Sequence, residues 1–183
     1  MSEQSLPLDY VEQPNPPPRP TLADERVRRT AAEALMPEII RWLGRDWREV
    51  ERQDYIDDLM EVAHIWDGYE AARTLENRSQ WMPDQDLVEI LGCFWGSAAL
   101  REATAKWVEA NCITPKLAIG QTVKIRKGRL GNDTGKITGI DKLQATYTVQ
   151  TTTFLREFQG QADKGGGNVY PFEDCEPESE TTP

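Results

Sequence analysis

The sequence predicts an α+β fold, with a helical N-terminal part followed by a small antiparallel β-barrel. Three observations lead to this prediction. Apolar residues recur at helical spacing in residues 21–112, and they alternate with polar residues from residue 117 onward. All six tryptophans precede this change, and glycine-rich turns follow it. Ile113, Thr114 and Pro115 lie at the boundary, where proline cannot continue a helix.

Residues 1–20 are expected to form a disordered or extended arm. They contain Pro7, Pro14, Pro16, Pro17, Pro18 and Pro20. Proline lacks an amide donor and restricts the preceding residue, so this segment cannot be helical. A solvated leader is the preferred interpretation, and a polyproline ligand is the alternative.

Residues 21–112 are expected to form a helical bundle. Thr21 is expected to cap the first helix, and a second helix is expected to begin at Pro37 and end at Gly44. One apolar stripe marks an amphipathic helix, through Tyr55, Ile56, Leu59, Met60, Ala63 and Trp66. The tryptophans are expected in the core of this bundle, at positions 42, 47, 66, 81, 95 and 107.

Residues 117–175 are expected to form the barrel, and residues 176–183 an acidic flexible tail. Apolar and polar residues alternate in 121–126, 136–141 and 145–149, with glycine, asparagine or aspartate between these runs. Residues 168–172 are expected to supply the closing edge strand, because Pro171 cannot donate to a central ladder.

The segment GQTVKIRKGRLGNDTGKITGID, residues 120–141, resembles a KOW motif. The likeness rests on Gly120, the alternation Val123-Lys124-Ile125, the pair Gly128 and Gly135, and Lys136-Ile137. The motif is the strand-loop-strand of SH3-like small barrels in transcription elongation factors and certain ribosomal proteins. The chain departs from the family in its loop, where an Asn-Asp-Thr insert follows Gly131.

The resemblance implies that the barrel binds nucleic acid or protein. Its candidate basic face comprises Lys124, Arg126, Lys127, Arg129, Lys136 and Lys142, which would contact phosphates. Tyr147, Phe154, Phe158 or Tyr170 would stack on bases. The alternative is that these bases are solvated side chains that discourage pairing between sheet edges.

Charge favours a protein partner over nucleic acid. The chain carries a formal charge of −10, whereas residues 117–160 hold seven basic and three acidic residues. An acidic protein repels nucleic acid at long range, even when one block of it is basic.

Asp54, Asp57, Asp58 and Glu61 form a candidate acidic face at helical spacing. It is interpreted as a solvated helix face, with cation binding as the alternative. A second alternative is a decoy that imitates nucleic-acid charge, because some small acidic proteins of bacteriophages and mobile elements have a similar overall look.

No catalytic or phosphate-binding motif occurs, so no enzymatic activity, metal or cofactor is expected. His64, the single histidine, is expected to be a packed or rim residue. Cys93, Cys112 and Cys175 lack metal-knuckle spacing, and their odd number leaves at least one of them outside any intramolecular disulfide. A reduced, cytoplasmic setting is therefore expected. No apolar run reaches the roughly 18 residues of a membrane span, and no membrane association is expected.

The expected function is therefore that of a non-enzymatic adaptor, which binds a protein partner through its helical domain and barrel. The alternatives are a nucleic-acid-associated factor that uses the basic face, and an acidic inhibitor of a nucleic-acid-binding protein.

Overall fold

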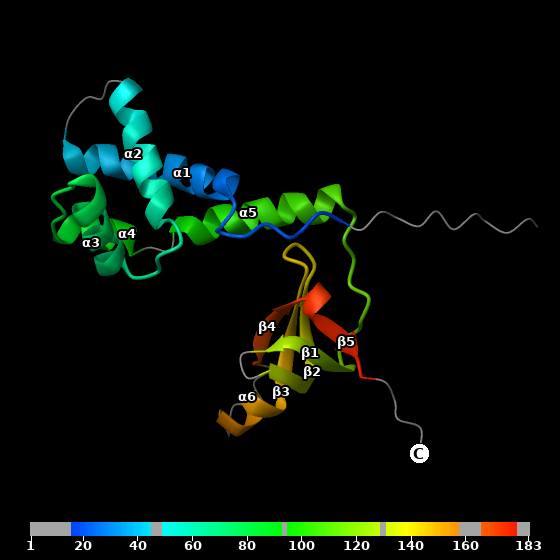
Figure 1. Ribbon diagram of the computed structural model, residues 1–183. Coiled ribbons are helices and arrows are strands. Elements are labelled where there is room, and N and C mark those ends of the chain that lie inside the picture. Colours follow the sequence, from blue (N-terminus) through cyan, green and yellow to red (C-terminus); the bar gives the residue numbers. More distant parts are fainter. Residues whose placement is uncertain (1–15, 45–48, 93–94, 129–130, 158–165, 179–183) are drawn as a thin grey trace, which may run out of the picture.

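The chain forms helices followed by an antiparallel sheet, which confirms the α+β class (Figure 1). The computed structural model describes residues 16–44, 49–92, 95–128, 131–157 and 166–178. The helices of the N-terminal half are α1 (Glu25–Leu43), α2 (Glu49–Val62), α3 (Gly68–Ser79), α4 (Gln85–Leu91) and α5 (Trp95–Ala110). Among the described helices, none has the length and apolar character needed to cross a bilayer.

Helix α1 runs through Pro37, so the second helix expected to begin there does not exist as a separate element. An interior proline costs roughly 3 kcal/mol. Met36 and Ile39 are both fully buried beside it, and their packing keeps the helix continuous. Gly44 ends α1 as predicted, with a φ of 64° and its N–H donating to the Ile40 carbonyl. The N-cap position is Asp24 and not Thr21.

The helical half has one main core, which is mostly aliphatic. Its buried members include Met36, Ile39, Leu59, Val62, Leu75, Leu87 and Leu91, from α1 to α4. The expectation that all the tryptophans lie in the core is wrong. Trp81 is buried, Trp42, Trp95 and Trp107 are half-buried, and Trp66 is 70% exposed; Trp47 lies outside the described residues. An indole N–H needs a polar partner, which places it near the surface.

Helix α5 connects the two halves of the molecule. Its N-terminal part packs on α1, where Val27 and Ala31 meet Ala99 in a second, smaller cluster. Its C-terminal part extends away from the other helices and lies over one end of the sheet (Figure 1). The Arg101 carbonyl there accepts a hydrogen bond of 3.0 Å from Nε2 of Gln144, which belongs to the sheet.

The sheet has five antiparallel strands in the order β4-β3-β2-β1-β5. The strands are β1 (Thr122–Gly128), β2 (Gly131–Asp141), β3 (Thr146–Thr151), β4 (Asn168–Pro171) and β5 (Cys175–Pro177). The predicted alternation is confirmed in β1, since Val123 and Ile125 are fully buried while Lys124 is exposed. Ile137, Tyr147 and Val149 complete the sheet core.

The expected closure of this sheet into a barrel is wrong, because the edge strands β4 and β5 are not paired with each other. They are joined only by a 3-10 helix, η2 (Phe172–Asp174). Such a connection spans at most about 14 Å, whereas the edges of a flat five-stranded sheet lie about 19 Å apart. The sheet is therefore strongly curved but open.

Three segments have a structure that differs from the one expected from sequence. Residues 16–20 of the arm are placed against α5 and the sheet. Glu176 and Pro177 of the expected tail pair with β1. A short helix, α6 (Thr152–Glu157), follows β3 within the expected barrel, and its Phe154 is buried. Residues 1–15 and 179–183 lie outside the described part.

Candidate binding site between the helices and the sheet

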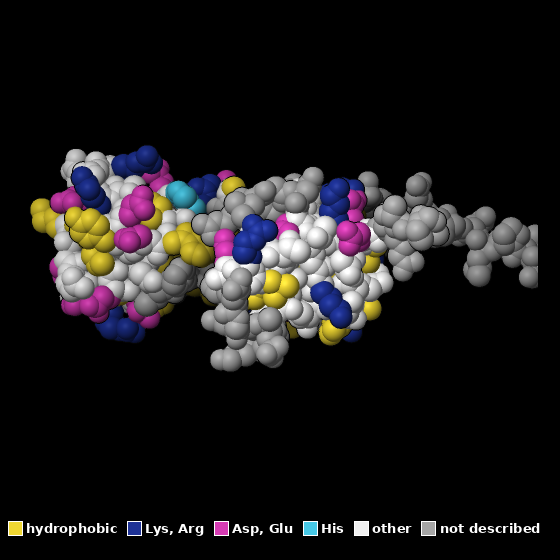
Figure 2. Space-filling view, turned by 90° about the horizontal axis from the view of Figure 1, so that it is seen from below, with side chains coloured by type: hydrophobic (Ala, Val, Ile, Leu, Met, Phe, Trp, Pro, Cys, Tyr) yellow, Lys and Arg dark blue, Asp and Glu magenta, His cyan; other side chains and the backbone are white. Residues whose placement is uncertain are grey.

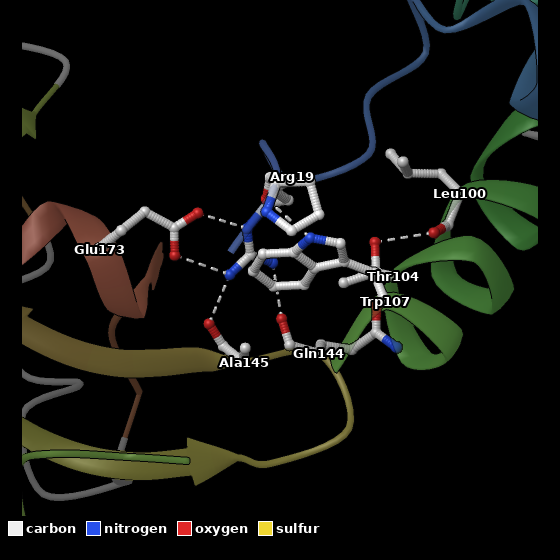
Figure 3. A network of polar contacts seen from close by, with 8 residues as sticks. Arg19, Leu100, Thr104, Trp107, Gln144, Ala145 and Glu173 are labelled. Atoms are coloured by element: carbon white, nitrogen blue, oxygen red, sulfur yellow. Dashed lines mark hydrogen bonds and ion pairs between the residues drawn. The ribbon is translucent and has the colours of Figure 1, made fainter. Parts of the chain in front are cut away.

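Arg19 joins the N-terminal arm to the sheet through four hydrogen bonds (Figure 3). Its Nε and Nη2 donate to the two carboxylate oxygens of Glu173, at 2.7 and 3.0 Å. Its Nη1 and Nη2 donate to the carbonyls of Gln144 and Ala145, each at 2.7 Å. A bidentate pair between arginine and carboxylate is both directional and strong. The guanidinium is thus held by a carboxylate and two carbonyls of the sheet.

Trp107 of α5 forms the helical side of the same network (Figure 3). The Arg19 guanidinium carbon lies 5.3 Å from the centroid of the indole ring, within reach of a cation–π interaction. The indole Nε1 donates to the Pro17 carbonyl at 2.9 Å. One arginine therefore connects the arm, α5 and the sheet, and we call Arg19, Trp107, Gln144, Ala145 and Glu173 the clasp.

Local sequence explains why the β2–β3 hairpin presents two carbonyls to this arginine. Asp141 Oδ1 accepts the backbone N–H of Leu143 and that of Gln144, each at 3.0 Å, which shapes the turn. Ala145 follows with a φ of 47°, in the left-handed region. Non-glycine residues adopt this conformation infrequently, and here it turns the chain back into β3.

Two grooves are lined in part by the arm, and Trp107 lines both. The first, of about 940 Å³, runs between α1 and α5. The second, of about 500 Å³, is bounded by the arm, the linker after α5, and the sheet. The second groove is largely apolar, with lining residues that include Ile113, Leu117, Tyr147, Phe172 and Pro177.

The predicted basic face is brought together only in part. Lys124 and Lys136 are both exposed on the outer face of β1 and β2, where they are diagonal neighbours. Neither has an ion-pair partner among the described residues. Arg126 follows on the same face of β1, but it forms an ion pair with Glu176 of β5. Within the described part of the sheet, Lys124 and Lys136 are thus the positive charges on this face without an ion-pair partner.

The other predicted members of the basic face lie elsewhere. Lys142 is exposed in the β2–β3 turn, beyond the end of β2. Arg129 and the side chain of Lys127 lie outside the described residues. Over the face shown in Figure 2, basic side chains of the sheet half are separated from one another, with acidic and hydrophobic side chains between them.

The aromatic residues expected to stack on bases are mostly unsuited to it. Tyr147 is 1% exposed and its hydroxyl accepts the Leu117 N–H at 3.0 Å, so it is a core residue and its assignment to a binding surface is corrected. Its position in β3 follows the same alternation that buries Val149. Phe154 is buried, Tyr170 is half-buried, and Phe158 lies outside the described residues.

The predicted acidic face is largely engaged within the protein. Asp58 accepts hydrogen bonds from Ser79 Oγ at 2.6 Å and from Trp81 Nε1 at 2.8 Å. Asp57 accepts from Gln53 at 2.8 Å and lies 3.6 Å from Arg29, and Glu61 pairs with Arg78 at 3.3 Å. Asp54 is exposed. Asp58 is therefore a structural carboxylate that orients Trp81.

Replacing Asp58 with alanine is expected to lower the free energy of unfolding of the helical half by about 2 kcal/mol, because the buried Trp81 N–H loses its acceptor. Asp54→Ala, on the same helix, removes a carboxylate that is exposed and is expected to change stability by at most about 0.5 kcal/mol. Urea unfolding followed by circular dichroism measures both. Equal midpoints for the two variants would contradict the structural role of Asp58.

The two described cysteines are unpaired and differ in accessibility. Cys112 is exposed, whereas Cys175 is buried at the start of β5. Burial, together with the charges of Asp174 and Glu173, raises the pKa of the Cys175 thiol to about 11. Cys93 lies outside the described residues, His64 is exposed on the surface, and the described residues contain no cluster of three or more potential metal ligands.

Cys175 is expected to react with iodoacetamide at pH 8 at least about tenfold more slowly than Cys112, because the thiolate is the nucleophile and a raised pKa lowers its fraction. Peptide mass spectrometry of the folded chain measures both rates. Under denaturing conditions the difference should disappear. A fast reaction of Cys175 in the folded chain would show that β5 is accessible.

Sequence reasoning did not find the clasp. It treated residues 1–20 as one solvated arm, although Arg19 is the single basic residue among the first 23. The feature of the sequence that could have indicated this contact is a lone arginine, Arg19, between two prolines. Its partner Glu173 lies 154 positions away, directly after the expected closing strand of residues 168–172, and no local pattern links the two.

A comparison with protein-family models, curated proteins and solved structures finds no significant match to this chain. By its fold, the chain is an α+β protein with a helical half and an open, curved antiparallel sheet. Its candidate binding site consists of the clasp and the two grooves.

Proposed function

We propose that this protein is a non-enzymatic adaptor that binds a protein partner through a surface made by both halves. In this proposal the helical half is a small bundle, and the open, curved sheet has an SH3-like arrangement of strands with a KOW-like β1–β2 unit. The strand order, the curvature and the short η2 connection support the SH3-like assignment. Fold likeness alone assigns no partner, so the proposal depends on the junction.

The observation that carries the proposal is the clasp. Arg19 bonds to the sheet and lies over Trp107 of α5, so the two halves are held in one arrangement. The groove beside it takes its walls from the arm, the linker and the sheet. Apolar grooves lined by aromatic residues and rimmed by charge are typical of protein-binding sites. The absence of a catalytic motif in the sequence supports the non-enzymatic part.

Lysine-directed cross-linking followed by mass spectrometry tests this function in native lysate. One partner protein is expected to cross-link both to Lys106 or Lys116, near the helical side, and to lysines of the sheet. Glu173→Ala removes the carboxylate that holds Arg19 without adding a reactive amine, and it is expected to reduce this double pattern. Glu76→Ala, at an exposed site on α3, should preserve it. Links from a partner to one half alone, in the unsubstituted chain, would contradict the proposal.

Nucleic-acid binding is the second candidate, favoured by the exposed lysines Lys124 and Lys136. It predicts affinity for RNA or DNA that falls steeply with salt and drops in the double variant with both lysines changed to glutamate. Unchanged affinity would exclude this face. The decoy alternative has less support, because Asp57, Asp58 and Glu61 bond within the protein.

A further inference from the structure

The clasp residues other than Arg19 form a receptor for a guanidinium group. Glu173 supplies a two-oxygen acceptor, the hairpin supplies two carbonyls, and Trp107 supplies a ring face. These groups match the planar fork of an arginine, whereas the compact ammonium of lysine cannot reach all of them at once. The Arg19 side chain is only 18% exposed there. The site therefore selects arginine.

The residues around Arg19 add a second requirement, for an extended proline-rich backbone. Pro16, Pro17, Pro18 and Pro20 offer no N–H groups, so a groove that holds them needs few acceptors. The groove instead supplies a donor, the Trp107 indole, which bonds the Pro17 carbonyl. Such a segment is already close to its bound shape, so little conformational entropy is lost on docking.

The chain's own arm fills this site incompletely. Pro16, Pro17 and Pro18 are exposed, and a groove of about 500 Å³ remains beside them, lined by Ile113, Leu117 and Phe172 among others. A bound segment with the same arginine and an apolar side chain directed into this groove would bury more apolar surface than the arm does.

We propose that the clasp is a docking site for a proline-rich, arginine-bearing extended segment of the partner protein, which replaces residues 16–20. This inference rests on the proposed protein-binding function and specifies the partner's chemistry. The arm competes as a tethered ligand at an effective concentration on the order of millimolar. It therefore restrains binding until a partner segment displaces Arg19.

Fluorescence anisotropy with a labelled synthetic peptide, PNPPPRP, tests the proposal on the purified full-length chain. The peptide is expected to bind Arg19→Ala at least about tenfold more tightly than the unsubstituted chain, because the tethered competitor has lost its anchor. Arg78→Ala removes an exposed arginine from a different ion pair and should behave like the unsubstituted chain. A peptide with lysine in place of its arginine should bind at least about tenfold more weakly to Arg19→Ala.

Two further variants keep the result decisive. Glu173→Gln in the Arg19→Ala background should weaken peptide binding at least about tenfold, because the charge-assisted pair is lost. If Arg19→Ala does not fold, Arg19→Lys and the unsubstituted chain are titrated to millimolar peptide, where displacement should shift the Trp107 indole resonance in NMR spectra. The proposal would be overturned if neither Arg19→Ala nor Glu173→Gln changed the affinity for the peptide. It would also be overturned if no folded variant bound the peptide. Because this titration uses no cellular partner, its failure leaves the adaptor function standing.

Discussion

Replacing Gly135 with alanine is expected to unfold the sheet, with a loss of about 3 kcal/mol or more. Gly135 lies at the centre of β2, paired with Val123 on one side and Thr151 on the other. A Cβ there would lie 2.6 Å from the Gln150 carbonyl oxygen and 2.7 Å from the Thr151 Cα. Both atoms belong to the backbone of β3, so no side-chain rotation relieves the clash.

The matched control is Gly139→Ala on the same strand. Its Cβ would lie 3.1 Å from the Thr148 Oγ1 and 3.3 Å from the Thr148 Cβ. Rotation about χ1 moves the Oγ1 away, and a shift of a few tenths of an ångström relieves the Cβ contact. The expected loss is below about 1 kcal/mol. Hydrogen exchange of the Ile137 and Val149 amides, which lie in the sheet, measures the effect of both substitutions. Equal protection in the two variants would show that β3 can move away from β2.

Replacing Trp81 with alanine is expected to destabilise the helical half by about 4 kcal/mol. Trp81 is 8% exposed and belongs to the main helical core. Its ring stacks on Trp42 at a centroid distance of 6.1 Å and lies 4.8 Å from Tyr55. The substitution leaves a cavity and removes the hydrogen bond to Asp58. Urea unfolding followed by circular dichroism at 222 nm, a wavelength dominated by helix, measures the loss.

The neighbouring residue provides the control for Trp81. Met82 is 89% exposed, and Met82→Ala is expected to change stability by at most about 0.5 kcal/mol. Because the two residues are adjacent in the chain, a difference in stability between the two variants reports the burial of Trp81 and not its position in the loop. Similar midpoints for the two variants would mean that the loop between α3 and α4 does not pack as the structure has it.

Much of the fold follows from local patterns in the sequence. The alternation around Val123 and Ile125 predicts a strand with one buried face, and that face is buried. Gly44 ends α1 as its position suggested, since a left-handed residue there satisfies a free carbonyl. The prediction that a helix begins at Pro37 is wrong. The local preference of proline for a helix start is outweighed by the burial of Met36 and Ile39, which depends on how the helices pack.

Sequence patterns do not predict the clasp, and they predict the basic face of the sheet only in part. Lys124 and Lys136 lie on one exposed face because β1 and β2 are paired neighbours. Arg126 shares that face, but its charge is neutralised by Glu176, a residue of a strand that the sequence did not predict. Aromatic type alone suggests a surface role for Tyr147, whereas its alternation with Val149 indicates the buried face that the structure shows.

Periodicity within short stretches of chain is enough to predict the α+β class, the change from helix to strand near Pro115 and the inward face of the sheet. Only the packing of helices and sheet brings Arg19 to Glu173 and places Trp107 of α5 against Pro17 of the arm. Those contacts join residues up to 154 positions apart, and no local pattern encodes a pairing that exists only once helices and sheet have packed together.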